Sequence, residues 1–429
     1  MTLALSCWAI LLAVLGWQTR AYLGAARVAG LAVCVILGLQ TAVRPAIFFA
    51  GLDTPSPDAW FSGPDWPLIA LALLTVSVWM ALFGLAYAAA AQIRAPSVLL
   101  PRMTAPPDTG AVLTIAATLT ALNLACTGAL VMKAGGVAEF IVAVKVGKDL
   151  AGLYVLREIG TLAVPLLVLA GLLSPRRAWP VAALIALNFA ANMLWGNRTN
   201  IALLGLAALA SVHFFLRPLR LRDLAMLAAL AVAGLEGLKA LRLLLLTEAL
   251  GTAAQADLDF WTALSASLHF NQFDALMLAL RDAGELFDLT GGREALNGLL
   301  AWVPRFLWPE KDVFAVGGWF RRVYEPGVVN GWPVTVVGSW YLNFGWAGLP
   351  FGAILSGIVA ARIDATYRDL RSNAFAAAIA PATAFLLLDG GTNFGLVQRY
   401  VLFVVPLAGI ALLLRTRDAV ASPAVRGTP

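Results

Sequence analysis

Long apolar runs separated by polar segments occupy most of this chain. The runs are continuous and not alternating, which predicts membrane-spanning helices and disfavours the strands of a membrane barrel. Eleven spans are predicted: Thr2–Trp17, Arg27–Phe49, Pro67–Ala91, Ala111–Val131, Gly160–Ser174, Trp179–Trp195, Ile201–Leu216, Asp223–Thr247, Pro333–Ala361, Asn373–Leu388 and Gln398–Leu414. Several are shorter than the roughly 20 residues of a perpendicular span, so their ends and tilts are open. The first run lacks a basic leader and a small-residue cleavage site, which favours a retained span over a signal peptide.

One polar segment, between the eighth and ninth spans, is much longer than the others. The chain therefore divides into spans 1–8 (residues 1–251), a large loop (252–333), spans 9–11 (334–417) and a tail (418–429). The large loop concentrates arginine, tryptophan, proline and both kinds of charge. In a protein with so little polar material, we expect the chemistry to lie where polar residues gather.

Composition agrees with the pattern. Of the 429 residues, 61% are hydrophobic and only 13% are charged, whereas a soluble domain carries about 25% charged residues. A water-soluble fold cannot hide that much apolar surface, so the predicted class is an all-α polytopic membrane protein. Cys7, Cys34 and Cys126 lie in apolar runs and are interpreted as packed thiols that need no disulfide.

Basic residues in alternate short loops predict the orientation. One set of loops carries Arg20, Arg27, Arg94, Arg102, Arg176, Arg177, Arg217, Arg220, Arg222, Arg362, Arg368, Arg371, Arg415 and Arg417. The opposite set includes the acidic, proline-rich segment Asp53–Asp58. The first set should face the cytoplasm, which places the N-terminus and the large loop outside and the C-terminus inside. The net charge of +6 reflects this bias and does not indicate nucleic-acid binding.

Arginines on the outer side oppose the usual charge bias, and an anionic ligand would explain them. The guanidinium donates two parallel hydrogen bonds to phosphate and stays charged. Arg198 lies in the short turn Gly196–Asn200 beside Trp195, and Arg305 lies between Pro304 and Pro309. The alternatives are headgroup contacts, ordinary salt bridges, or an interfacial helix that only rests on the membrane surface.

Two residues of the large loop are candidate bases. His269 and Asp274 are five positions apart, which on a helix is about 140° around the axis, so a local dyad is not supported. Each could act alone on a sugar hydroxyl, or could serve as a cap or hydrogen-bonding group. The other histidine, His213, has no acidic neighbour and is interpreted as structural.

Metal and transport signals are weaker. Asp257-Leu258-Asp259 is a lone D-x-D pattern without a surrounding βαβ domain, and no Cys/His pair has zinc spacing. We therefore expect no metal and no cofactor. Glu236, Lys239 and Arg242 are charged residues in the eighth span; a transport pathway and a structural role both remain open.

Three elements together resemble the Wzy-type oligosaccharide repeat-unit polymerases of O-antigen and exopolysaccharide synthesis. They are Asn-x-Phe-Asp at Asn271–Asp274, Pro-Arg-x-x-Trp-Pro-x-Lys at Pro304–Lys311, and the segment Gly338–Gly348 entering a span. The turn Gly196–Asn200 also resembles a Gly-x-Arg element of that family. The specific resemblance covers Asp259–Arg362; elsewhere only the number of spans and the loop layout agree.

The resemblance implies a GT-C-like membrane glycosyltransferase at the outer face of the bacterial inner membrane. It would transfer a growing glycan from undecaprenyl diphosphate to a lipid-linked repeat unit, with inversion and without a metal. Partners would be the lipid-linked donor and acceptor, with a chain-length regulator as a further candidate. Arg198, Arg305 and Lys311 would bind the diphosphate, with Arg322 and Arg399 in reserve. His269 and Asp274 are the candidate bases, and Glu158 is a weaker one.

Three other functions remain open. An O-antigen ligase would share the fold and the arginine-bearing loop but would use a lipid A core as its acceptor. A polysaccharide flippase should show internal pseudo-symmetry and broken helices near the middle of the membrane. A noncatalytic partner in an export complex should tolerate substitution of its arginines.

Overall fold

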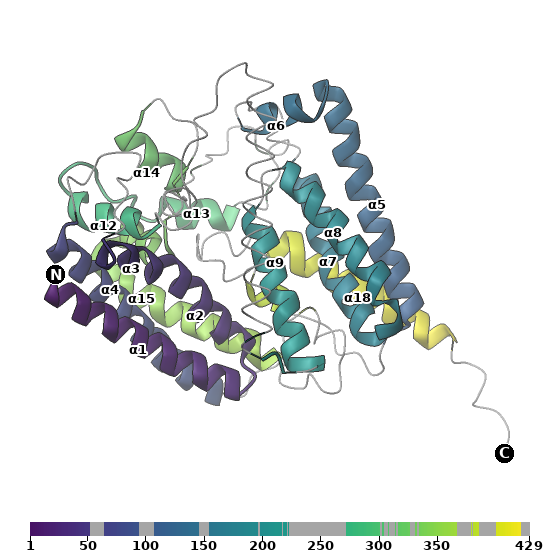
Figure 1. Ribbon diagram of the computed structural model, residues 1–429, viewed down its shortest axis with the longest axis horizontal. Coiled ribbons are helices and arrows are strands. Elements are labelled where there is room, and N and C mark those ends of the chain that lie inside the picture. Colours follow the sequence, from purple (N-terminus) through teal and green to yellow (C-terminus); the bar gives the residue numbers. More distant parts are fainter. Residues whose placement is uncertain are drawn as a thin grey trace. The chain divides into compact units, whose positions relative to one another are not determined.

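A computed structural model describes the chain over most of the predicted spans and part of the large loop. It covers residues 1–51, 64–93, 107–145, 154–195, 198–216, 218–220, 222, 272–300, 303, 308, 314, 316–326, 331–332, 334–366, 379, 381–385 and 400–421. All regular elements in these stretches are helices (Figure 1).

Within these stretches, six helices are long and apolar enough to cross a membrane. They are Thr2–Gly24, Val28–Phe49, Trp66–Gln92, Thr109–Ala134, Pro175–Leu194 and Val336–Ala365. Shorter apolar helices are Glu158–Leu173, Ile201–Phe214 and Tyr400–Leu414. The prediction of an all-helical chain with membrane-spanning character is confirmed at this level. The predicted span Asp223–Thr247 lies outside the described residues, and only 379 and 381–385 of Asn373–Leu388 are described.

The chain forms two compact units, each assembled from separate stretches of sequence. Unit 1 comprises Met1–Ser97, Asp257–Ala365 and Leu387–Val401; unit 2 comprises Val98–Ala256, Thr366–Leu386 and Leu402–Pro429. Most of the large loop therefore belongs to the same unit as the N-terminal helices.

Unit 1 contains long apolar helices and the short helices of the large loop. Its described helices are α1 (Thr2–Gly24), α2 (Val28–Thr41), α3 (Val43–Phe49), α4 (Trp66–Gln92), α12 (Gln272–Asp282), α13 (Arg293–Leu300), α14 (Val316–Tyr324) and α15 (Val336–Thr366). Helix α1 packs against α2 and α4, and α12 packs against the same two helices (Figure 1). On α4, Trp79 stacks on Phe83 and Phe83 contacts Tyr87, all three fully or almost fully buried.

Helix α15 is interrupted at Gly345. This residue has φ 62° and ψ −150°, so α15 is two helical segments joined at a sharp break. That backbone conformation is essentially restricted to glycine. Beyond the break, Gly357 lies directly against α4, where an added Cβ would come within 2.5 Å of the Phe83 carbonyl oxygen. The small residue therefore allows the second segment of α15 to approach the α4 backbone closely.

The turns of unit 1 that carry basic residues meet at one end of the bundle. Asp364, near the end of α15, accepts hydrogen bonds from two backbone N–H groups in the first turn of α2 and from the Tyr87 hydroxyl at the end of α4. The Arg27 guanidinium lies over the Tyr87 ring, and Arg362 donates to the Ile93 carbonyl. The carboxylate thus caps α2 and joins three helix ends.

Unit 2 is a second helical bundle. Its described helices are α5 (Thr109–Ala134), α6 (Val137–Lys145), α7 (Tyr154–Leu173), the 3₁₀ turn η2 (Pro175–Arg177), α8 (Ala178–Leu194), α9 (Arg198–Ser211), the π-helical η3 (Val212–Leu216) and α18 (Val405–Ala421). The π-helical η5 (Tyr400–Val404) precedes α18. Helix α5 packs along α7, and both contact α8.

A buried polar seam joins the helices of unit 2. The Asn188 amide donates to Thr120 Oγ1 at 2.8 Å, and Asn123 donates to Asn188 Oδ1 at 3.2 Å. A Cβ on Gly160 of α7 would collide with the Asn123 amide nitrogen. These interactions fix the register of α5, α7 and α8 in the core of the bundle.

Candidate active site

Three carboxylates in the described part of the large loop are buried in unit 1. Asp274, Asp282 and Glu294 expose only 6%, 8% and 5% of their surface. Acidic side chains are almost never this buried unless they are paired. Each of the three has charged or hydrogen-bonding partners, and those partners distinguish what each carboxylate can do.

Glu294 is held by two residues of the first segment of α15. Its Oε2 accepts a hydrogen bond from Ser339 Oγ at 2.7 Å and another from Asn343 Nδ2 at 2.8 Å. Ser339 and Asn343 are four residues apart on one helix, so both side chains face α13. Thr290 Oγ1 donates to Asn343 Oδ1 at 2.9 Å, which sets the orientation of the amide. Glu294, Ser339, Asn343 and Thr290 are called the carboxylate junction below.

The backbone before α13 explains how Glu294 reaches α15. Gly291 and Gly292 have φ values of 59° and 82°, a region that favours glycine. A Cβ on Gly292 would lie 2.8 Å from the Phe344 ring. The Thr290 N–H donates to the Leu342 carbonyl at 2.8 Å. The break in α15 leaves carbonyl groups without their intrahelical donors, and the loop supplies one.

The surroundings of Glu294 change its acidity. Burial raises the pKa of the Glu294 carboxyl to about 7, and the hydrogen bonds from Ser339 and Asn343 oppose that rise in pKa. A carboxyl with a pKa near neutrality exchanges its proton readily at physiological pH. Such groups are candidates for general acid–base roles.

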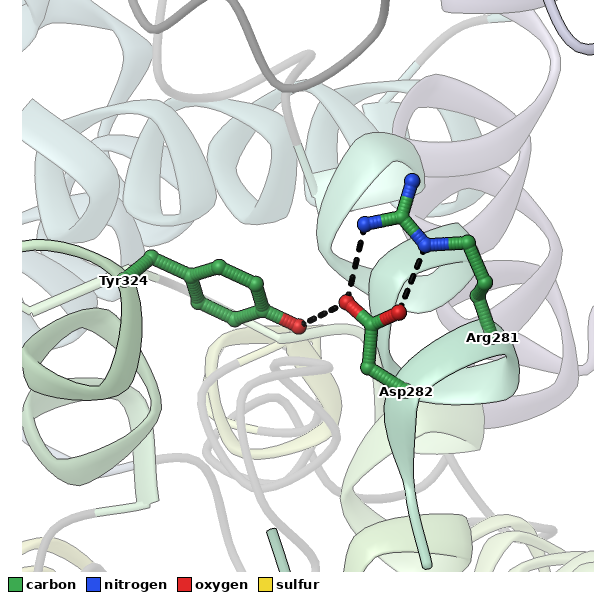
Figure 2. A network of polar contacts seen from close by, with 3 residues as sticks. All are labelled: Arg281, Asp282 and Tyr324. Atoms are coloured by element: carbon green, nitrogen blue, oxygen red, sulfur yellow. Dashed lines mark hydrogen bonds and ion pairs between the residues drawn. The ribbon is translucent and has the colours of Figure 1, made fainter. Parts of the chain in front are cut away.

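Asp282 belongs to a different network (Figure 2). Its carboxylate accepts from Arg281 Nε at 2.6 Å, from Arg281 Nη2 at 2.9 Å and from the Tyr324 hydroxyl at 2.6 Å. The hydrogen bond to Asp282 raises the pKa of Arg281, and burial together with Asp282 raises the pKa of Tyr324. Asp282 therefore ties α14 to the end of α12.

Arginine and aromatic side chains of the large loop form one continuous set of contacts, here called the arginine–aromatic cluster. Its members are Arg293, Arg321, Phe287, Phe314, Trp319, Phe320, Tyr324 and Trp332, and Arg281 is linked to Tyr324 through the carboxylate of Asp282. The Arg293 guanidinium lies 4.7 Å from the Phe314 ring centroid, and Arg321 lies 5.8 Å from that of Trp332. Guanidinium groups suit phosphate, and aromatic faces provide apolar contact area for a ligand.

Asp274, a predicted base, is paired with Arg44. The Arg44 Nε lies 3.1 Å from Asp274 Oδ2, and the two side chains are 2% and 8% exposed. The guanidinium of Arg44 also lies over the Phe48 ring at 4.6 Å. This ion pair joins α12 to α3. Arg44 was not among the predicted site residues, although an arginine within an apolar run is a signal that could have identified it.

The other predicted site residues are divided between the units. Arg322 is exposed on α14 of unit 1. Glu158 is half-buried on α7 of unit 2, and Arg198 begins α9 of the same unit. His269, Arg305, Lys311 and Arg399 lie outside the described residues, as do Asp257, Asp259, Glu236, Lys239 and Arg242. His213 Nδ1 accepts from the Leu219 N–H at 3.1 Å, in agreement with a structural role.

Sequence reasoning did not single out Glu294, Ser339 or Asn343. Ser339 and Asn343 lie within the family-like segment Gly338–Gly348, and their spacing of four in an apolar helix was a usable signal for a buried polar partner. Glu294 itself follows two glycines and an arginine in a polar loop. Nothing local distinguishes it from other acidic residues of the loop.

Within the described part of the chain, no group of three or more His, Cys, Asp or Glu side chains is arranged to hold a metal ion. No protein-family model, curated protein or solved structure matches this chain. The function is therefore argued from the site itself.

Proposed function

We propose that this protein is a membrane glycosyltransferase that polymerises undecaprenyl-diphosphate-linked oligosaccharide repeat units at the periplasmic face of the bacterial inner membrane. The observation that carries the proposal is the arginine–aromatic cluster, which the large loop builds beside long apolar helices. A lipid-linked glycan offers the two features that such a cluster suits: an anionic diphosphate and sugar rings with apolar faces.

The proposed reaction makes the cations necessary. A hydroxyl of the acceptor sugar attacks the anomeric carbon of the donor glycan, with inversion, and the bond to the diphosphate oxygen breaks. Negative charge grows on that leaving group. A preorganised cation in a water-poor site stabilises this charge, and loss of one such donor often costs about 3 kcal/mol. Arg293 and the exposed Arg322 are the described candidates, alongside the sequence-based candidates Arg198, Arg305, Lys311 and Arg399.

The arrangement of unit 1 supports an outer position for the site. Arg27 lies over the Tyr87 ring and Arg362 donates to the Ile93 carbonyl, both near the end of α4, as expected for cytoplasmic turns. Helix α2 runs from that end towards α3, where Arg44 pairs with the large loop. The loop helices therefore contact the end of the bundle that is opposite the basic turns.

Gel analysis of surface glycan after deletion of the gene tests the proposal. We expect single repeat units to persist and the ladder of longer chains to disappear. Complementation with the double variant Arg293→Ala/Arg322→Ala should restore protein but not the ladder. Arg176→Ala removes another exposed arginine, from a turn of unit 2, and should restore the ladder. A normal ladder from the deletion strain would refute the proposal.

The same gels separate the other functions. A polysaccharide transporter is the second candidate, because the break in α15 at Gly345 is of the kind that transporters place at substrate sites. Loss of all repeat units from the outer surface would favour it. Polymer that remains on the lipid carrier and never reaches a lipid A core would indicate a ligase. Unchanged glycan from the arginine variant would favour a noncatalytic assembly partner.

A further inference from the structure

The hydrogen bonds at the carboxylate junction have a defined direction. Thr290 donates to Asn343 Oδ1, so the Asn343 amide nitrogen is the atom that faces Glu294. That nitrogen can only donate, and the Ser339 hydroxyl also donates. Both bonds reach Oε2, so this oxygen is occupied as an acceptor. A proton taken up by Glu294 would therefore be carried on the other oxygen, Oε1.

The junction lies beside the arginine–aromatic cluster. Glu294 directly follows Arg293, whose guanidinium contacts Phe314 in that cluster. Both residues are in the first turn of α13. The same short helix therefore carries both groups. Arg293 is a cation suited to a diphosphate, and Glu294 is a carboxylate that would take up a proton on Oε1. A glycosyl transfer needs both groups close together.

We propose that Glu294 is the catalytic residue that accepts the proton of the acceptor hydroxyl, and that Ser339 and Asn343 are the positioning residues that hold its carboxylate. This inference rests on the proposed function. The hydroxyl proton passes to Glu294 as the hydroxyl oxygen bonds to the anomeric carbon. The carbon–oxygen bond to the diphosphate breaks, and its electron pair leaves with the diphosphate. Water then takes the proton from Glu294.

Burial supports the assignment. The same enclosure that leaves Glu294 only 5% exposed raises its pKa to about 7, which makes the carboxylate a stronger base than an exposed one. Ser339 and Asn343 stabilise the charged form and keep an adequate fraction ionised at neutral pH. Removal of either hydrogen bond should therefore raise the pKa further.

Purified wild-type and variant proteins in detergent, given a lipid-linked repeat unit as donor and acceptor, test the inference. Glu294→Gln keeps the shape and the two accepted hydrogen bonds but cannot take a proton. We expect its kcat to fall about 10²- to 10⁴-fold with little change in KM. Glu285→Gln is the matched control, since Glu285 is exposed in the same loop. It should retain the wild-type rate.

The pH profile supplies a readout that a purely structural role would not move. The wild-type rate should decline as the pH falls below about 7, where Glu294 becomes protonated. Ser339→Ala should shift this decline, the acid limb of the pH profile, to higher pH. A wild-type rate for Glu294→Gln, or an unshifted limb for Ser339→Ala, would overturn the assignment while leaving the polymerase proposal intact. Absence of any polymer from the wild-type protein would overturn the proposed function, and this inference with it.

Discussion

Arg44 and Asp274 are 230 positions apart in the sequence, yet they form an ion pair with almost no exposure to solvent. Two charges removed from water are costly, and their attraction offsets that cost only while both remain. The pair therefore couples the large loop to the N-terminal helices. It also changes the interpretation of Asp274, because its carboxylate is already engaged by the Arg44 guanidinium.

Asp274→Asn should destabilise the protein more than it impairs chemistry. It removes the carboxylate beside the buried Arg44, which should lower the free energy of unfolding by about 3 kcal/mol. Thermal unfolding in detergent measures the effect. The double variant Arg44→Met/Asp274→Leu replaces the pair by apolar groups and should recover much of the loss. An unchanged unfolding midpoint together with lost turnover would instead support Asp274 as the base.

Glu294 should make stability depend on pH. Its pKa is about 7 in the folded protein against 4.5 for an unperturbed carboxyl. Between these pH values the folded state holds more protons at Glu294 than the unfolded state does. The contribution of Glu294 to the free energy of unfolding is therefore fully present below pH 4.5 and is lost as the pH rises through 7. The total change in the free energy of unfolding from this group is on the order of 3 kcal/mol.

Thermal unfolding near pH 5.5 and near pH 8 should show this dependence. The fall in the unfolding midpoint between the two conditions should be larger for wild-type protein than for Glu294→Gln, whose side chain is neutral throughout. All other titrating groups are common to both proteins, so the difference isolates Glu294. An equal fall in both proteins would mean that the carboxyl keeps an ordinary pKa.

At the scale of elements, the break in α15 determines where the site forms. The first segment presents Ser339 and Asn343 to α13, and the second packs closely on α4 through Gly357. Gly345 joins them in a conformation that other residues adopt only with strain. In a continuous helix the Leu342 carbonyl would accept from the next turn and would not need the Thr290 N–H.

Gly345→Ala should disturb this break. Positive φ strains an alanine, and its Cβ would also lie 3.1 Å from Leu289, so we expect a loss of about 1–3 kcal/mol in the free energy of unfolding. Gly16 lies within α1 of the same unit, and a Cβ added there would meet nothing within 4 Å, which makes Gly16→Ala the control. Denaturation in detergent compares the two. Equal stability of both variants would show that α15 tolerates a continuous path at Gly345.

At the scale of the whole molecule, the basic turns of unit 1 gather at one end, and the large loop contacts the end of α3. The charge bias predicts that the first end faces the cytoplasm. This orientation makes a prediction for every loop, because successive spanning helices must alternate in direction.

Labelling of single cysteines in cells tests the orientation. In a background without Cys7, Cys34 and Cys126, a membrane-impermeant maleimide should label Glu285→Cys in spheroplasts with an intact inner membrane. Ala25→Cys, exposed at the turn after α1, should react only after that membrane is permeabilised. The reverse pattern would place the large loop in the cytoplasm and rule out a periplasmic reaction.

The sequence by itself determined the helical class and the approximate positions of most described helices. A span must satisfy its backbone hydrogen bonds internally and match the apolar thickness of the bilayer, and both requirements are local. It also predicted that the chemistry lies in the large loop. The break in α15 was not predicted, because Gly345 lies in an apolar run that looks continuous.

Only the tertiary structure decided which residues the buried carboxylates pair with. Glu294 is separated by 45 and 49 positions from the two donors that hold it, and Asp274 by 230 positions from Arg44. Periodicity describes which face of one helix is apolar, whereas a carboxylate's acidity depends on which other segments exclude water from it and donate to it. Those contacts arise from packing between distant stretches of chain, which is why a structural ion pair and a candidate base looked alike in the sequence.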